Sequence, residues 1–315
     1  MRDLRIVFMG TPEFAVSSLE AILDAGYNVV GVITAPDRPA GRGRKLRESA
    51  VKSYALSKDL KILQPVNLKS EEFQSELKGL KPNVQVVVAF RMLPKSVWNL
   101  PEYGTFNLHA SLLPQYRGAA PVNWAIINGE KSTGVSTFFL DEKIDTGAMI
   151  LDEETKIKED ENVESLHDRL MEIGSKLVVK TLKLIATNRV KTEAQQDTNI
   201  LKEAPKLTKD NTKIDWNAPV EKIYNLIRGL NPYPAAWCYL ENSSEELKVK
   251  IYDIKKINQE HHLPNGTVTI SDNKIKIAAL DGYILVNEIQ LPGKRKMLSK
   301  ELLNGFNFAP DAKMR

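Results

Sequence analysis

The chain has 315 residues, a hydrophobic content of 42%, a charged content of 27% and a formal net charge of +4. This length exceeds one typical domain and suits two, and the composition is ordinary for a globular protein. The single cysteine, Cys238, excludes an intrachain disulfide, and no pair of cysteines or histidines has metal-ligand spacing. We therefore expect a two-domain protein without a metal.

The excess of positive charge lies in the last third of the chain. Residues 206–315 hold 17 Lys and Arg against 13 Asp and Glu, whereas residues 1–205 hold 27 against 27. This bias is compatible with a nucleic-acid partner, but it is weak on its own because many solvated surfaces carry a similar excess. No apolar run is long enough to span a bilayer, and the opening MRDLRIVFMGTPEF is interrupted too soon for a secretory signal. We therefore expect a cytoplasmic protein that does not contact a membrane.

The first half alternates between short apolar runs and segments with helical spacing. Helices that alternate with buried apolar strands predict a mainly parallel sheet covered on both faces. Functional residues are then expected at the carboxyl ends of the strands, at the point where the strand order reverses. The predicted strands lie at 4–10, 27–34, 84–90, 105–110 and 133–141, and the helices at 11–26, 51–59 and 163–186.

The second half begins with a polar stretch without periodicity, which indicates a linker. A short helix at 219–230 follows, and then five short strands with turn signals, which suggest a small barrel. These strands are predicted at 235–241, 247–257, 265–273, 274–282 and 283–293. The resulting division is an α/β domain at 1–189, a linker at 190–208 and a barrel domain at 209–315.

The stretch NLHASLLPQYRGAAP at 107–121 is the strongest candidate for chemistry. On a strand, Asn107 and His109 lie two residues apart and share a face. A donor amide beside an imidazole suits acyl transfer by acid–base and oxyanion assistance. A carboxylate is still needed to orient the imidazole. Asp145 is the candidate and Asp141 its competitor, and sequence alone brings neither to His109.

Other common sites are absent from the sequence. GTPEF at 10–14 lacks the G-x-G-x-x-G fingerprint, no P-loop occurs, and Ser111 lacks the glycines of a nucleophile elbow. The loop at 34–48 is rich in Arg and Lys and contains Gly41 and Gly43. It is either a solvated loop or a mobile finger that binds phosphates, and its spacing does not decide between these.

Taken together, these stretches resemble the methionyl-tRNA formyltransferases. The segment at 107–121 matches the family pattern N-x-H-x-SLLP-x-x-RGAAP, and the resemblance covers nearly the whole chain. Further matches are VFMGTPEFA, PDRPAGRGRKL, TGVSTFFLDEKIDTGAM, IDW, RGLNPYPAAW and LPGKRKM. The resemblance implies a Rossmann-like formyltransferase domain followed by an OB-like β-barrel that holds RNA.

The resemblance also implies a reaction and the residues that perform it. A formyl group passes from 10-formyltetrahydrofolate to the amino group of methionine on initiator Met-tRNA, giving formylmethionyl-tRNA for translation initiation by a monomeric enzyme. Asn107 hydrogen-bonds the developing oxyanion, His109 stabilises that charge or shuttles the proton, and Asp145 orients His109. The residues that border the folate are Ser111, Leu112, Leu113 and Pro114. Arg42 matches the loop arginine that reaches toward the acceptor end of the tRNA in this family, and we expect Arg38, Arg44 and Lys45 of the same loop to contact tRNA with it. From charge and turn position we also expect phosphate contacts at Lys294, Arg295 and Lys296.

Two departures from the family pattern and two rival functions stay open. Arg91 stands where a glycine is usual, and it either binds the folate tail or turns to solvent. Ala110 replaces a common glycine. The first rival is a formyltransferase for another amine, such as a purine-pathway ribonucleotide or an amino sugar. The second is a non-catalytic RNA-binding protein, which the intact set of Asn107, His109 and Asp145 disfavours.

Overall fold

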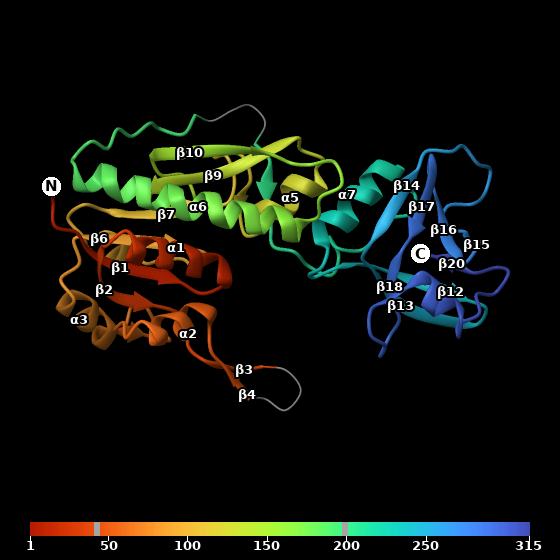
Figure 1. Ribbon diagram of the computed structural model, residues 1–315, viewed down its shortest axis with the longest axis horizontal. Coiled ribbons are helices and arrows are strands. Elements are labelled where there is room, and N and C mark those ends of the chain that lie inside the picture. Colours follow the sequence, from red (N-terminus) through yellow and green to blue (C-terminus); the bar gives the residue numbers. More distant parts are fainter. Residues whose placement is uncertain (41–44, 197–200) are drawn as a thin grey trace. The chain divides into compact units, whose positions relative to one another are not determined.

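The computed structural model describes residues 1–40, 45–196 and 201–315, and it divides into two compact units (Figure 1). Unit 1 is formed by Met1–Gly118, Gly134–Thr155 and His167–Glu203. Unit 2 is formed by Ala119–Thr133, Lys156–Leu166 and Ala204–Arg315. The segments 119–133 and 156–166, which lie between parts of unit 1 in the sequence, therefore belong to the same unit as the carboxyl-terminal strands. The division at 1–189, 190–208 and 209–315 stays a prediction.

Within the described residues, unit 1 is built on a seven-stranded sheet in the order β10-β9-β7-β6-β1-β2-β5. Neighbours from β7 to β5 run parallel, whereas β9 is antiparallel to β7. The predicted mainly parallel sheet is thus confirmed. The strands are β1 (Arg5–Gly10), β2 (Asn28–Ile33), β5 (Ile62–Leu63), β6 (Val84–Val88), β7 (Thr105–His109), β9 (Ser132–Phe139) and β10 (Met149–Lys156).

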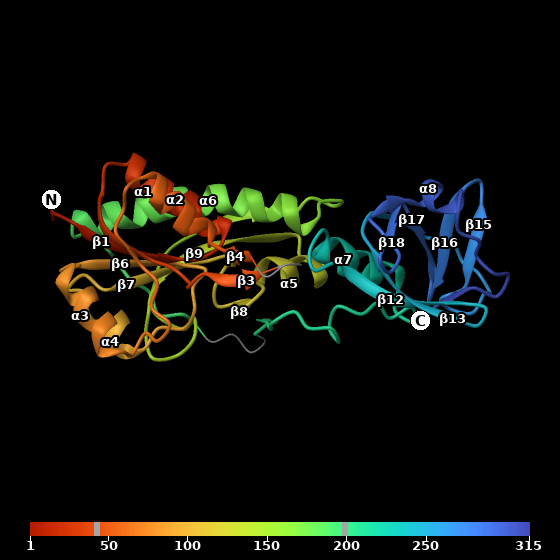
Figure 2. The same cartoon turned by 90° about the horizontal axis from the view of Figure 1, so that it is seen from below.

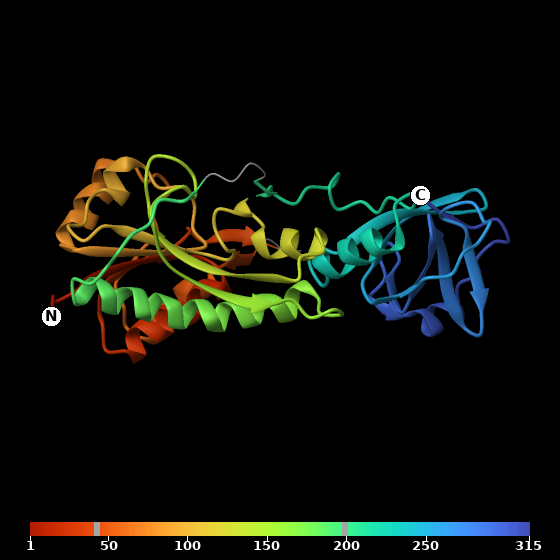
Figure 3. The same ribbon diagram turned by 90° about the horizontal axis from the view of Figure 1, so that it is seen from above.

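Helices cover both faces of this sheet (Figure 2). On one face lie α1 (Glu13–Asp24), α2 (Ala50–Ser57) and α6 (Val163–Ala186), and on the other lie α3 (Glu71–Gly79) and α4 (Lys95–Trp98). Figure 3 shows α6, in green, running along the face opposite to α3 and α4. Because helices cover both faces of the sheet, the central strand β6, VQVVV, is buried at all five positions. Val7 and Met9 pack with Phe73 and Leu77 of α3.

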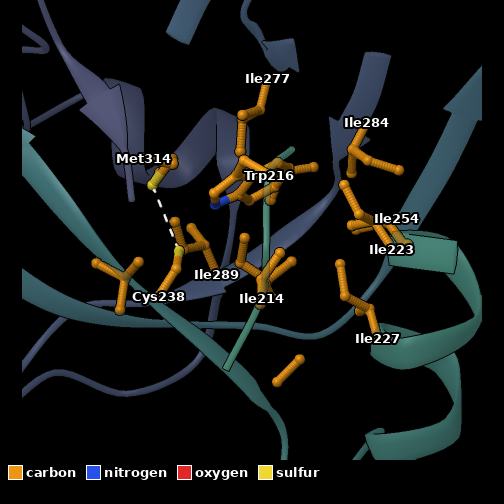
Figure 4. Packing of buried hydrophobic residues seen from close by; sticks show 14 of the residues in the cluster. Ile214, Trp216, Ile223, Ile227, Cys238, Ile254, Ile277, Ile284, Ile289 and Met314 are labelled. Carbon is orange, nitrogen blue, oxygen red and sulfur yellow. Dashed lines mark hydrogen bonds between the residues drawn. The ribbon is translucent and has the colours of Figure 1, made fainter. Parts of the chain in front are cut away.

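Unit 2 contains two antiparallel sheets, in the orders β19-β18-β13-β12-β20 and β14-β17-β16-β15. A shared core of isoleucines, Trp216 and Cys238 includes residues of both sheets and of α7 (Val220–Leu230) (Figure 4). Burial raises the pKa of Cys238 to about 12, so its thiol stays protonated at neutral pH. Whether the sheets close into an OB-like barrel stays a prediction. The strands and remaining helix are β12 (Ala236–Asn242), β13 (Glu245–Ile251), β14 (Ile254–Ile257), β15 (Val268–Ser271), β16 (Lys274–Ala279), β17 (Gly282–Val286), β18 (Glu288–Gln290), β19 (Met297–Leu298), β20 (Lys313–Met314) and α8 (Ser299–Leu303).

Two strands predicted as continuous are each divided, and in this respect the prediction is wrong. The run 247–257 becomes β13 and β14, and the run 283–293 becomes β17 and β18. In each case the two halves belong to different sheets. The chain turns at Asp253, whose carbonyl accepts hydrogen bonds from the amides of Asn287 (2.8 Å) and Glu288 (3.1 Å). Such corners let strands pass between packed sheets, and the apolar pattern continues through them.

Helix α5 (Pro121–Ile127) packs against α7 within unit 2. The two helices approach closely at Gly229, where an added Cβ would lie 2.7 Å from Cγ1 of Ile127. The side-chain amide of Asn123 donates to the carbonyl of Gly229 at 2.8 Å. The buried Arg228 donates to Glu161 O at 2.9 Å and to Asn225 Oδ1 at 2.8 Å. These contacts explain why the segments 119–133 and 156–166 belong to unit 2.

Candidate active site

Strand β7 presents Asn107 and His109 on one face, as the spacing predicts. Asn107 pairs in register with Val87 of β6 and Phe138 of β9, and His109 ends the strand opposite Ser136. His109 is only 7% exposed, and Asn107 is half-buried. Among the described residues, no hydrogen-bond partner occupies the Asn107 side-chain amide, so it can bind a ligand. The expected position at a carboxyl strand end is confirmed for His109. However, the strand order reverses between β1 and β6, one strand away from β7.

The ring of His109 is held by a backbone carbonyl. Its Nε2 lies 2.8 Å from the carbonyl oxygen of Tyr116, which can only accept, so Nε2 carries the hydrogen. Tyr116 has a φ of 60°, an unusual left-handed conformation for a bulky residue. Its amide donates to Lys202 O at 2.6 Å. This arrangement fixes the ring orientation and directs Nδ1 toward Asp145.

Asp145, rather than Asp141, is the carboxylate beside His109. Its Oδ2 lies 3.9 Å from Nδ1 of His109, and both side chains are largely buried. The same oxygen accepts the amide of Gly118 at 3.1 Å. A separation of 3.9 Å is too long for a direct hydrogen bond, and the two groups attract as an ion pair only when the imidazole is protonated. Asp141 instead accepts from Lys143 N and Thr146 Oγ1, both at 2.9 Å, within its own turn.

The turn that carries Asp145 is tightly packed. Asp145 itself has a φ of 55°. An added Cβ at Gly147 would lie 1.7 Å from the carbonyl oxygen of Phe139, so only glycine fits there. The amide of Phe139 donates to Ala148 O at 3.0 Å and closes the turn. The position of the carboxylate therefore depends on backbone packing that no sequence spacing reveals.

The segment 111–114 forms a compact loop after His109. Ser111 is fully buried, and its hydroxyl donates to Gln115 O at 2.6 Å. Ser136 Oγ donates to Ser111 O at 2.7 Å and accepts the amide of Leu113 at 3.2 Å. Leu112, Leu113 and Pro114 are half-buried. The Ser111 side chain is thus used within the protein, while the next three residues keep partly accessible surface.

The predicted basic loop begins and ends in a two-stranded hairpin, β3 (Arg38–Ala40) and β4 (Lys45–Arg47) (Figure 1). Arg38 is exposed. Arg42 and Arg44 lie outside the described residues, and for Lys45 only the backbone is described. Lys52 Nζ lies 2.5 Å from Asp37 Oδ2 at the base of the hairpin. This hydrogen bond lowers the pKa of the Asp37 carboxyl and raises the pKa of Lys52.

The second predicted basic group follows β18. Lys294, Arg295 and Lys296 are all exposed. Lys296 Nζ lies 2.8 Å from Glu288 Oε2, which raises its pKa, and 5.2 Å from the centre of the Tyr252 ring. One of the three charges is therefore already paired.

Arg91 is exposed, which agrees with the solvent-facing alternative, and it also contacts the protein backbone. Its guanidinium donates to the carbonyls of Val66, at 2.9 Å, and Pro65, and so ties the loop after β5 to the end of β6. Partial burial, and to a smaller extent the charge of Arg38, lower its pKa. Arg91 therefore has a structural contact that the sequence did not indicate.

A group of rings and cations on unit 2 was not predicted from the sequence. We name it the lysine–aromatic face (Lys213, Trp237, Tyr239 and Lys248). The rings of Trp237 and Tyr239 meet edge to face at 5.3 Å. Lys248 Nζ lies 3.7 Å from the centre of the Trp237 ring, and Lys213 Nζ lies 5.3 Å from that of Tyr239. The alternation of AAWCYLE, with Cys238 and Leu240 buried, was the available signal.

This face carries unbalanced positive charge. Partial burial and repulsion from Lys209 and Lys250 lower the pKa of Lys248. The indole N–H of Trp237 donates to Lys209 O at 2.9 Å, and the amide of Ile214 donates to Trp237 O at 2.8 Å. The Trp237 ring is thus fixed by a hydrogen bond, the Tyr239 ring packs against its edge, and the lysines lie over both rings. Aromatic rings of this kind can stack with nucleic-acid bases, and the nearby cations can bind phosphates.

Two kinds of feature are absent from the described residues. The part of the chain that the structure describes contains no cluster of three or more His, Cys, Asp or Glu side chains arranged to hold a metal ion. Across residues 1–40, 45–196 and 201–315, no helix is both long and apolar enough to cross a membrane.

Comparison with known proteins identifies the family. The formyl transferase family model matches residues 4–182, and the model of the formyl transferase C-terminal domain matches residues 206–307. A methionyl-tRNA formyltransferase of Flavobacterium johnsoniae is 58% identical to this chain, and the match covers 100% of both chains. That of Bacteroides thetaiotaomicron is 53% identical, with 99% of this chain and 98% of the relative covered.

A solved structure shares the fold at lower identity. WlaRD, a sugar 3N-formyl transferase determined in the presence of dTDP and 5-N-formyl-THF, is 21% identical with a TM-score of 0.66. The match covers 94% of this chain and 100% of WlaRD. At this identity the likeness shows the fold alone.

Proposed function

Because the chain belongs to the methionyl-tRNA formyltransferases, we propose that it transfers the formyl group of 10-formyltetrahydrofolate to the methionine amino group of initiator Met-tRNA. The bond between the formyl carbon and N10 of the folate breaks as the new amide forms, so the products are tetrahydrofolate and formylmethionyl-tRNA, which serves translation initiation. The structural observation that carries the proposal is the face of β7. It sets the Asn107 amide beside the His109 imidazole, with the Asp145 carboxylate 3.9 Å from the ring.

Asn107 is the proposed oxyanion donor. Attack of the neutral amine on the formyl carbon places negative charge on the formyl oxygen, and a fixed amide N–H stabilises that charge. Such a donor lowers the barrier by roughly 2.7–4 kcal/mol. The strand position supports this role, because β6 and β9 hold both sides of β7 and leave the side-chain amide accessible.

His109 acts through Nδ1 in this proposal. The carbonyl of Tyr116 occupies Nε2, so the proton of the attacking amine can reach the ring only at Nδ1, directly or through a water. Asp145 faces that atom and stabilises the imidazolium that forms. The positive ring in turn stabilises the oxyanion. Asp145 itself is held by the amide of Gly118 and need not take the proton.

The folate donor is proposed to lie against the segment 111–114. Leu112, Leu113 and Pro114 retain accessible surface and offer an apolar wall. Ser111 shapes this segment from within, because its hydroxyl is bonded to Gln115 O. The donor is a co-substrate, and no metal is expected in the reaction.

The tRNA is proposed to contact cations on both units. On unit 1 these are Arg38, Arg42, Arg44 and Lys45 of the basic loop, whose base is fixed by Asp37 and Lys52. On unit 2 the predicted contacts are Lys294, Arg295 and Lys296, to which we add the lysine–aromatic face. Phosphates relieve the repulsion among its lysines, and the rings can stack bases. A monomeric, cytoplasmic enzyme is expected.

The test is a transfer assay with purified protein. It contains 10-formyltetrahydrofolate and Met-tRNA of the initiator or elongator type, with formylmethionine detected by mass spectrometry. A parallel reaction replaces the tRNA with a dTDP-amino sugar, since a solved relative of the same fold acts on a sugar. We expect formylation of initiator Met-tRNA alone. Formylation of the sugar would assign another amine. Binding of tRNA with no transfer to any amine would instead leave an RNA-binding protein.

A further inference from the structure

The polar stretch after α6 is attached to the turn that carries Asp145. Met149 and Glu193 exchange two backbone hydrogen bonds, of 2.8 Å and 3.1 Å, which place residues 193–195 beside this turn. Further along, Lys202 bonds Gln115 and Tyr116 through its backbone, and β11 (Glu203–Ala204) pairs with β8 (Arg117–Gly118). This part of the predicted linker therefore borders the candidate site.

Gln195 uses both ends of its side chain at this border. Its Nε2 donates to the carbonyls of Asp145 and Gly147, both at 2.9 Å. Its Oε1 accepts from Nε of Arg117 at 3.1 Å and from Nη2 at 2.7 Å. All these contacts lie within unit 1. One half-buried amide thus joins the turn of Asp145 to the strand of Arg117.

The two elements joined by Gln195 are those that locate the catalytic carboxylate. Asp145 lies in a left-handed conformation on the turn, and its Oδ2 is held by the amide of Gly118, the residue after Arg117. Gln195 bonds the backbone of the turn on one side of that 3.1 Å contact and the side chain of Arg117 on the other side. The contact in turn sets how far Oδ2 lies from Nδ1 of His109.

We propose that Gln195 is a positioning residue for Asp145 and acts on the reaction only through the Asp145–His109 pair. The inference rests on the proposed function of that pair. Loss of the amide would remove the hydrogen bonds to the two turn carbonyls and to the Arg117 side chain, and the turn could then shift the carboxylate away from Nδ1. Displacements of about 1 Å at reacting groups cost on the order of 100-fold in rate. We therefore expect substitution of Gln195 to lower kcat about 10- to 100-fold and to leave KM for both substrates within about threefold.

The test uses two variants and a matched control in the full-length enzyme. Gln195→Met removes every hydrogen bond at similar volume. Gln195→Glu keeps an acceptor for Arg117 and loses both donors to the turn. Gln196→Leu changes the exposed neighbouring glutamine. We expect both Gln195 variants to lose kcat and Gln196→Leu to keep it. In an Asp145→Asn background, Gln195→Met should cause no further loss, because both substitutions remove the same interaction.

A measurement independent of turnover separates this inference from the proposed function. In ring-labelled protein, the NMR signals of His109 should shift in Gln195→Met and not in Gln196→Leu. Unchanged His109 signals in Gln195→Met would overturn the inference even if the enzyme is a formyltransferase. In the Asp145→Asn background, a further loss of kcat together with a lower melting temperature would also overturn the inference. Gln195 would then be a purely structural residue. Wild-type protein that transfers no formyl group would refute the function, while the His109 signals still test the positioning.

Discussion

The site around His109 and the lysine–aromatic face of unit 2 both gather polar groups, but they hold them in opposite ways. His109 is bound by a backbone carbonyl and Asp145 by a backbone amide, and both side chains are nearly buried. Lys213 and Lys248 are exposed cations that lie over rings and are not bound to carboxylates within the described residues. The first arrangement fixes distances for a chemical step, and the second provides charge that adapts to a polyanion.

The largest effect is expected for His109→Ala. Loss of the imidazole removes the group that takes the proton and offsets the oxyanion charge, so kcat should fall by about 10²- to 10⁴-fold. Steady-state formylation of Met-tRNA measures this, and circular dichroism confirms folding. His167→Ala, in α6, is the matched control and should keep normal turnover. Near-normal kcat in His109→Ala would remove His109 from the mechanism.

Gly147→Ala tests whether the buried site depends on tight backbone packing. The added Cβ would meet the carbonyl oxygen of Phe139 at 1.7 Å, so the turn must shift. We expect a loss of about 2–3 kcal/mol in the free energy of unfolding, measured by denaturant titration. Gly79→Ala is the control, because an added Cβ there meets nothing within 4 Å. Equal stability of the two variants would show that the turn is more adaptable than its geometry indicates.

The double variant Lys213→Ala/Lys248→Ala tests the exposed region. Loss of two phosphate contacts should raise KM for tRNA and reduce the slope of log KM against log salt by about two, while kcat stays near that of the wild type. Lys176→Ala, which removes an exposed lysine paired with Glu172 on α6, serves as the control. An unchanged KM in the double variant would exclude this face from the RNA surface.

The smallest effect is expected for Asp37→Asn, at the base of the basic hairpin. The hydrogen bond from Lys52 lowers the pKa of Asp37, so the charged carboxylate stabilises the folded state. This stabilisation is complete above the unfolded pKa of about 3.9 and is lost as the pH falls through the lower folded value. Thermal melts of wild type and variant should differ slightly at pH 7 and converge in acid. A difference that grows in acid would contradict this assignment.

Sequence reasoning succeeded where a regular period carries the information. The two-residue spacing of Asn107 and His109 gave their common face, and the helical spacing gave α6 over its observed length. It could not choose between Asp145 and Asp141, because the choice depends on a left-handed turn and on the amide of Gly118. Tyr116 contributes through its carbonyl, which any residue possesses. Gln195 lies in a stretch without periodicity, so nothing in the sequence marked it.

The most direct test of the contrast between the two regions is a salt titration of wild-type formylation, with kcat and KM for initiator Met-tRNA measured separately. Buried, hydrogen-bonded groups are little screened by salt, whereas phosphate contacts weaken with each released counterion. We predict that KM rises steeply between low and moderate salt while kcat stays constant. A kcat that falls with salt at constant KM would contradict the assignment of chemistry to the His109 site and of RNA binding to the exposed cations.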